Sequence, residues 1–339
     1  MRDSTSGRLA KPGQWLAAVI GRAGIAGSFA VGLVSAFMGS LGAWPTPGLF
    51  RNAESSEDRV RTTARPSRAA VVSRDGTRID YERRGSGPAL VLVHGGLVDR
   101  TFWGPSLPLL AVHYTVYAMD RRGHGHSDAY PADHRIEREY EDLAALVAAI
   151  HAPVAVLGHS GGAHVALQAA RRCDLVRQLV LYEPPRFDAF SPAVLARLHA
   201  SLEAGDLDDV LATVLVDVIA ADLNPGLLPG ARPAVLAGMR DSPIWAAAMR
   251  NVRSIPAEAD SYAAYRFGPA EFRDWSTPTV LLLGSTTGPV MRRWVEDLRA
   301  VLPSSHIMML EGQGHGAMVE APELFVRTVR AALEWAPVS

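Results

Sequence analysis

The stretch PVAVLGHSGGAHVALQAA, residues 153–170, decides how the chain folds. It opens with a continuous apolar run, which is typical of a short strand buried on both faces. It closes with GAHVALQAA, whose apolar residues have helical spacing. Ser160 therefore falls on the turn from a strand to a helix, and the sequence around it fits the pattern G-x-S-x-G.

A serine on such a turn is a candidate nucleophile. The turn strains the serine backbone, and bulky side chains two residues away would clash, so Gly158 and Gly162 suit these two positions. A glycine-rich turn with an incidental serine is the alternative, and the predicted strand and helix on either side disfavour it. The backbone N–H of Gly161, directly after the serine, is a candidate donor to an oxyanion.

Strand-like and helix-like segments alternate on both sides of this stretch. Two short runs in which apolar and polar residues alternate lie on either side of Asp75-Gly76, and they predict a β-hairpin. Alternation with helix-like segments such as 138–150 predicts a mostly parallel sheet with helices on both faces, in the α/β class. The further strands are expected at 89–96, 115–120, 177–185, 277–285 and 305–312.

Residues 186–277 break the alternation, because only helix-like stretches occur there. We expect an inserted helical cap over about 186–277, within a folded domain that spans 70–339. Its aromatic and thioether side chains suggest an apolar pocket, although such residues at helical spacing are more often plain core. The pocket candidates are Leu97, His159, Phe187 and Trp245, with Phe190, Met239 and Met249 as further cap residues.

A nucleophilic serine needs a base and two convergent backbone N–H groups. His315, in GQGHGAM after the last predicted strand, stands where loops leave the carboxyl edge of the sheet, so it is the candidate base. The loop after VLVHGG supplies the second donor, with Gly96 as the first candidate and Leu97 as the alternative. His94 is expected to fix this loop.

Four motifs stand in order along the chain: HGG (94–96), DRRGHGHS (120–127), GHSGG (158–162) and GQGH (312–315). Together they resemble the α/β-hydrolase superfamily over about residues 70–339. The resemblance implies a mostly parallel eight-stranded sheet, a cap inserted after the sixth strand, and a serine, an acid and a histidine in that order. It implies no substrate.

The acid departs from the commonest pattern of that superfamily. The turn after the seventh strand reads Gly284-Ser285-Thr286-Thr287-Gly288 and holds no carboxylate. A second arrangement in the superfamily places the acid after the sixth strand, where this chain has Glu183. A carboxylate at the end of a buried strand needs a partner, and His315 would be one. The alternatives are a purely structural Glu183, Asp297 as the acid, or no acid at all.

The serine narrows the expected chemistry. Dehalogenases and epoxide hydrolases of the superfamily use aspartate at this position, so those activities are disfavoured. We expect a serine hydrolase acting on a small, fairly apolar ester or lactone through Ser160, His315 and Glu183. A haloperoxidase or perhydrolase without a cofactor, a carbon–carbon bond hydrolase, and a non-catalytic ligand-binding module are the alternatives.

Composition excludes several other roles. The chain has 339 residues, and its 34 Lys and Arg nearly cancel its 35 Asp and Glu, which leaves no basic surface for nucleic acid. Its single cysteine, Cys173, excludes an intramolecular disulfide and a cysteine-based metal site. We expect a small-molecule substrate, no metal and no cofactor.

The first part of the chain has a different character. Residues 23–50 carry no charge and follow several basic residues. The 22 residues of the run 23–44 would be about 33 Å long as a helix, enough to cross a bilayer core. A signal peptide or a membrane anchor is expected here, with the enzyme exported or facing outward, and residues 51–69 read as a linker. A dispensable extension of a cytoplasmic protein is the alternative.

Overall fold

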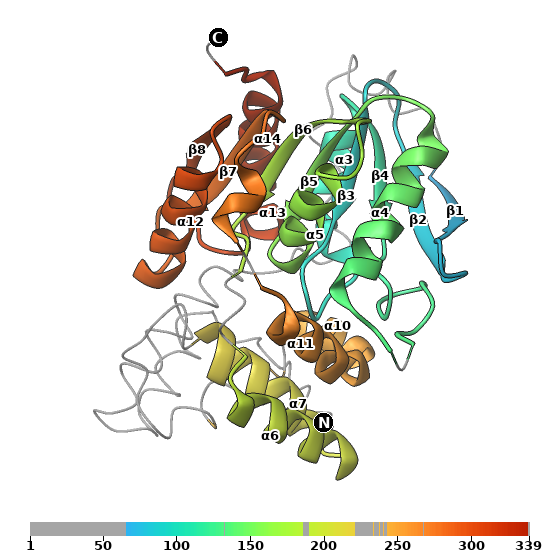
Figure 1. Cartoon of the computed structure of the whole chain (residues 1–339), viewed down its shortest axis with the longest axis vertical. Coiled ribbons are helices and arrows are strands. Elements are labelled where there is room, and N and C mark those ends of the chain that lie inside the picture. Colours follow the sequence, from blue (N-terminus) through green and yellow to red (C-terminus); the bar gives the residue numbers. More distant parts are fainter. Residues whose placement is uncertain are drawn as a thin grey trace, which may run out of the picture.

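The computed structural model describes residues 66–131, 133–185, 190–220, 243–266 and 268–337, together with positions 233, 237 and 240. An eight-stranded sheet runs through this part of the chain, in the order β1-β2-β4-β3-β5-β6-β7-β8 (Figure 1). Strand β2 is antiparallel to both of its neighbours, and the strands from β3 to β8 are parallel. The strands are β1 (Ser67–Val72), β2 (Arg78–Arg84), β3 (Ala89–Val93), β4 (Thr115–Met119), β5 (Val154–His159), β6 (Val176–Tyr182), β7 (Thr279–Gly284) and β8 (Ser305–Leu310).

The expected hairpin is formed by β1 and β2. Gly76 adopts a φ of 90° in the turn, and the N–H of Ser73 donates to the carbonyl of Thr77 at 2.8 Å. The domain was expected to begin near residue 70, and β1 begins three residues earlier, at Ser67, inside the predicted linker. Its side chains are mostly exposed at the sheet edge, so the strand is held by backbone pairing and lacks the apolar signal of a buried strand.

Helices cover both faces of the sheet. One face packs against α4 (Ile136–Ile150), α5 (Gly161–Ala170) and α12 (Pro289–Val301). The other packs against α3 (Ser106–Ala111), α13 (Ala317–Glu320) and α14 (Pro322–Glu334). A short 3₁₀ helix, η1 (Arg100–Trp103), precedes α3.

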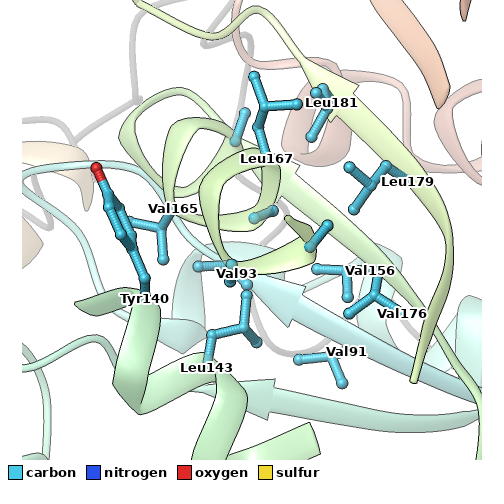
Figure 2. Close-up of a cluster of buried hydrophobic side chains, with 14 of the residues drawn as sticks. Val91, Val93, Tyr140, Leu143, Val156, Val165, Leu167, Val176, Leu179 and Leu181 are labelled. Atoms are coloured by element: carbon cyan, nitrogen blue, oxygen red, sulfur yellow. The ribbon is translucent and has the colours of Figure 1, made fainter. Parts of the chain in front are cut away.

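The core between the sheet and α4, α5 and α12 explains the orientation of α4. Tyr140 and Leu143 lie one turn apart on its apolar face and are buried against α5 and the sheet (Figure 2). Each such apolar side chain stabilises the fold by about 1.5–3 kcal/mol. This packing fixes α5, and with it the turn that holds Ser160.

Between β6 and β7 the chain forms a group of helices beyond the end of the sheet (Figure 1). These cap helices share a core in which Leu198, Leu211 and Trp245 are buried. Their bounds are α6 (Pro192–Glu203), α7 (Leu207–Ala212), the π-helix η3 (Thr213–Ala220), α10 (Pro243–Asn251), η4 (Val252–Ser254) and α11 (Ile255–Ala264). A short 3₁₀ helix, η5 (Pro269–Phe272), follows, and its Phe272 packs into the core that α4, α5 and α12 share with the sheet.

The predicted signal or anchor at 23–44, and most of the predicted linker, lie outside the described residues. Among the helices described from residue 66 onward, none has the length and apolar character needed to cross a bilayer.

Candidate active site

Ser160 stands at the end of β5 in a strained backbone conformation. Its φ of 50° and ψ of −127° are rare for a residue with a side chain. The conformation is held from both sides, because the N–H of Ser160 donates to the carbonyl of Tyr182 at 2.9 Å and its carbonyl accepts from Ala163 at 2.8 Å. The strain places the side chain at the tip of the turn.

The two glycines of the pattern have no room for a side chain. A Cβ on Gly158 would lie 2.5 Å from the Cα of Ala163. One on Gly162 would lie 2.3 Å from the carbonyl oxygens of Val93 and His94. Any larger residue at either position would overlap backbone atoms, because α5 packs closely against β5 and β3.

Glu183 and His315 meet across the carboxyl ends of the sheet. Glu183 follows β6 with a φ of 44°, another strained position, and its side chain is fully buried. His315 Nδ1 lies 2.7 Å from Glu183 Oε2. Because an ionised carboxylate only accepts, Nδ1 carries the proton and donates, which leaves Nε2 free to act as a base.

The other oxygen of Glu183 is held by the turn after β7. The backbone N–H of Gly284 donates to Oε1 at 2.8 Å, and the hydroxyl of Thr287 donates to the same atom. A buried carboxylate is stable only when donors satisfy it. The turn that lacks an acid of its own therefore holds the acid supplied by the neighbouring strand. Asp297, the alternative acid, pairs with Arg293 at 3.1 Å on the exposed face of α12.

The loop that carries His315 rests on the sheet through two contacts. The hydroxyl of Tyr182 donates to the carbonyl of Gly314, and His159 Nε2 lies 3.0 Å from the carbonyl oxygen of His315. Burial and the neighbouring His315 lower the pKa of His159 well below its usual value, so His159 is neutral. Its role in the structure is to support this loop.

A cavity of about 100 Å³ opens beside Ser160 and His315. The predicted oxyanion donors Gly96 and Gly161 and the predicted pocket residue Leu97 all line it. Leu97 has a φ of 68°, so the loop after β3 turns sharply there. Most of the lining is apolar and comes from the cap, the loops below it and the first turn of α12: Pro185, Phe190, Val214, Val218, Ile219, Ile255, Ala259 and Met291.

Two of the predicted pocket residues, His159 and Trp245, do not line this cavity. His159 precedes Ser160 at the end of β5, and its ring packs against that of His315 with the ring centroids 4.5 Å apart. Trp245 is packed in the core of the cap, which was the alternative considered for aromatic residues at helical spacing. Phe187 and Met239 lie outside the described residues. Met249 packs against the cap core.

The loop after β3 is held by His94, as expected. Its Nδ1 lies 2.7 Å from the carbonyl oxygen of Gly95, and its Nε2 accepts from the backbone N–H of Arg121 at 2.9 Å. Burial lowers the pKa of His94 well below its usual value, so the ring is neutral and can accept this bond.

One wall of the cavity is polar and was missed by the sequence reasoning. Glu258 and Tyr262 of α11 both line the cavity. Glu258 Oε1 lies 2.7 Å from Arg121 Nη2 and accepts from the hydroxyl of Tyr262 at 3.1 Å. The guanidinium also pairs with Glu139 of α4 at 2.7 Å. No local sequence signal connects residues so far apart along the chain.

Metal binding has no obvious place in the part of the chain that the structure describes. No group of three or more histidine, cysteine or carboxylate side chains has a suitable arrangement there. The polar side chains around Ser160 are those of His315, of its partner Glu183, and of Glu258 and Tyr262.

Comparison with known proteins decides the family. The model of the alpha/beta hydrolase family matches residues 90–328. The chain belongs to this family. The sheet order and the predicted resemblance agree with it, and the protein is therefore an enzyme with the alpha/beta-hydrolase fold.

Individual relatives are hydrolases. The chain is 25% identical over 272 residues to a 2-(acetamidomethylene)succinate hydrolase of Mesorhizobium japonicum, covering 74% of this chain and 90% of the relative. It is 28% identical over 269 residues to a pimeloyl-[acyl-carrier protein] methyl ester esterase of Photobacterium profundum, covering 75% and 98%. The crystal structure of an alpha/beta hydrolase from Sphaerobacter thermophilus aligns with a TM-score of 0.66 and 31% identity, covering 78% of this chain and 100% of that one.

Proposed function

We propose that this alpha/beta hydrolase is a serine esterase or lactonase that acts on a small, fairly apolar substrate through Ser160, His315 and Glu183. The observation that carries the proposal is the 2.7 Å contact between His315 Nδ1 and Glu183 Oε2, beside the strained serine. Ser160 and His315 line one cavity, so a substrate in that cavity contacts both.

The proposed reaction begins with proton transfer from the Ser160 hydroxyl to His315 Nε2 as the serine oxygen attacks the ester carbonyl. Glu183 keeps the imidazole in the tautomer with Nδ1 protonated and stabilises the imidazolium that forms. The backbone N–H groups of Gly96 and Gly161 are the proposed donors to the oxyanion. His315 then protonates the leaving alcohol, and an acyl group remains on Ser160.

Hydrolysis of this acyl-enzyme repeats the sequence with water. His315 Nε2 takes a proton from the water, which attacks the acyl carbon, and returns it to Ser160 as the acid product leaves. Atoms balance: one ester and one water give one carboxylic acid and one alcohol. No cofactor enters either half of the reaction.

Two further observations support an ester as the substrate. The cavity lining is mostly apolar, which suits an ester better than a highly charged molecule. One relative is named as a methyl ester esterase. The contact between His315 and Glu183 also favours catalysis over a non-catalytic binding module, because such a module needs no oriented base.

A series of aryl esters tests the proposal. The rate at which the full chain hydrolyses the acetate, butyrate, hexanoate and decanoate esters of p-nitrophenol is measured. We expect kcat/KM to be higher for the shorter acyl groups. Ser160→Ala should lower turnover by several orders of magnitude, whereas the protein should unfold at a similar temperature. Turnover that survives this substitution would overturn the assignment of the nucleophile.

A further inference from the structure

The hydrophobic core of the cap includes one residue of the loop after β3. Leu97 is buried in this core together with Ile255 and Ala259 of α11. In the part of the chain that the structure describes, Leu97 is the one buried member of the core that comes from outside the cap. It directly follows Gly96, the proposed oxyanion donor, so the cap holds the loop at the position next to this donor.

The backbone of Leu97 has a conformation that needs support. Its φ of 68° lies in the left-handed region, which a residue with a side chain adopts only when its surroundings hold it there. Asn251, the last residue of α10, supplies one such contact, because its Nδ2 donates to the carbonyl oxygen of Leu97 at 3.3 Å. The cap therefore holds Leu97 both at its side chain and at its carbonyl.

The amide of Asn251 is buried, and its contacts fix its orientation. Nδ2 also donates to the carbonyl oxygen of Ala247, within α10, at 3.2 Å. Oδ1 accepts from the backbone N–H of Gly125, in the loop after β4, at 3.2 Å. Two carbonyl groups face the nitrogen and one N–H faces the oxygen, so a reversed amide would lose all three bonds. Asn251 thus links the cap to the loops after β3 and β4.

Another cap side chain makes a comparable bond to the core of the protein. Ser254 Oγ, three residues after Asn251, donates to the carbonyl oxygen of Gly123 at 2.5 Å. Gly123 lies in the loop after β4, so this hydrogen bond attaches the cap to that loop and not to the loop after β3. The two side chains therefore separate attachment of the cap from support of Leu97.

We propose that Asn251 is a positioning residue for the oxyanion hole, and that the cap completes this hole by holding Leu97. The oxyanion forms only in the transition state, so a displaced N–H of Gly96 would slow the chemical step and leave substrate binding almost unchanged. This kinetic consequence rests on the proposed ester hydrolysis, but the support of the loop by Asn251 does not.

Asn251→Asp tests the proposal by steady-state kinetics. It keeps an acceptor for Gly125, but an ionised carboxylate cannot donate to the carbonyl of Leu97. For p-nitrophenyl butyrate we expect kcat to fall about tenfold or more, with KM changed by about twofold at most. Asn251→Ala, which introduces no buried charge, is the second variant and should show the same division. A raised KM at unchanged kcat in both variants would overturn the proposal.

Ser254→Ala is the matched control, because it removes one hydrogen bond between the cap and the loop after β4. We expect it to keep the kcat of the unaltered protein. An equal loss of kcat in Ser254→Ala and Asn251→Ala would show that the reaction needs the attachment of the cap as such, and it would overturn the specific role of Asn251.

A transition-state analogue reports on the oxyanion hole itself. Ser160 Oγ forms a bond to the carbonyl carbon of butyl trifluoromethyl ketone, the carbonyl π bond opens to an oxyanion, and the serine proton passes to His315. Hexan-2-ol has no electrophilic carbon and is the comparison ligand. We expect Asn251→Asp to weaken inhibition by the ketone about tenfold and to leave inhibition by the alcohol almost unchanged. Equal weakening of both would overturn the proposal.

Hydrogen exchange examines the loop without any turnover. The amides of residues 94–99 should exchange with deuterated water about tenfold faster in Asn251→Asp than in the unaltered protein, and at an unchanged rate in Ser254→Ala. Equal exchange in all three proteins would overturn the role of Asn251 and leave the esterase intact. Faster exchange in Asn251→Asp, with none of the three proteins inhibited by the ketone, would overturn the esterase and leave the support of the loop by Asn251 intact.

Discussion

The hydroxyl of Thr287 donates a hydrogen bond to Oε1 of Glu183. Thr287 lies in the turn after β7, and Glu183 follows β6, so the contact joins the ends of two neighbouring strands. The backbone N–H of Gly284 reinforces it at 2.8 Å. The turn fixes one oxygen of the carboxylate, which leaves the other oxygen directed at His315.

The proposed role of Glu183 as the partner of His315 is tested by Glu183→Gln, which keeps the shape of the side chain and removes its charge. We expect kcat to fall by about two to four orders of magnitude, because the imidazolium loses its partner and the ring loses its preferred tautomer. KM should change little. Asp297→Asn is the matched control, and it should be silent because Asp297 is exposed and pairs with Arg293. The reverse result, a silent Glu183→Gln and an inactive Asp297→Asn, would move the acid to α12.

Thr287 is tested separately as a positioning residue. Thr287→Val removes one donor to a buried carboxylate, a bond worth about 1.5–3 kcal/mol, so we expect kcat to fall about tenfold. Thr287→Ser keeps the hydroxyl and should restore most of the rate. Equal activity of the valine and serine variants would show that the Gly284 contact alone suffices.

Sequence reasoning placed Ser160, Glu183 and His315 on the right elements because each follows a recognisable strand. The local sequence was enough there, since the carboxyl ends of parallel strands meet at one edge of a sheet. The number of strands and their mostly parallel arrangement followed from the strand-like segments and from the resemblance of four motifs to one superfamily, and the sheet and the family match confirm both.

Glu258 and Tyr262 were missed for a physical reason. They lie on α11 (Ile255–Ala264), inside the segment that was expected to be a helical cap, but the sequence does not show which side of a cap helix faces the cavity. Their importance comes from contact with Arg121, a residue of another motif whose position relative to α11 only tertiary packing determines. Trp245 packs in the cap core, which was the alternative, because an aromatic residue on an amphipathic cap helix packs equally well toward a core or a cavity.

His164 gives the fold a predictable pH dependence. Burial lowers its pKa from 6.5 to about 3, and its Nε2 lies 2.6 Å from the hydroxyl of Tyr140. Below 6.5 the unfolded chain binds a proton that the folded chain does not, so the free energy of unfolding falls as the pH drops toward 3. Above 6.5 the group contributes no pH dependence.

His164→Gln checks this dependence, because glutamine keeps a hydrogen-bonding group near Tyr140 and does not titrate. Between pH 7 and pH 5 the variant should lose less free energy of unfolding than the unaltered protein, by up to about 2 kcal/mol. Urea titrations at the two pH values measure the difference, and the other buried histidines cancel in the comparison. Identical losses would mean that His164 does not titrate abnormally.

The run 23–44 remains a prediction from the sequence. We propose that it directs the chain to the membrane or across it, with the folded part outside the cytoplasm. A reporter that is active only after export, fused after Arg51 in a bacterial host, should be active. A soluble, inactive fusion would favour the dispensable extension instead. Removal of residues 1–65, which spares β1, should leave ester hydrolysis unchanged in either case.

The central claim is that Ser160 is a nucleophile activated by His315, and a fluorophosphonate probe tests it most directly. The full chain is treated with the probe and digested, and the modified peptide is identified by mass spectrometry. The account predicts one adduct, on Ser160, which forms much more slowly in His315→Ala because no base removes the serine proton. An adduct on another residue, or labelling of Ser160 at an equal rate without His315, would contradict it.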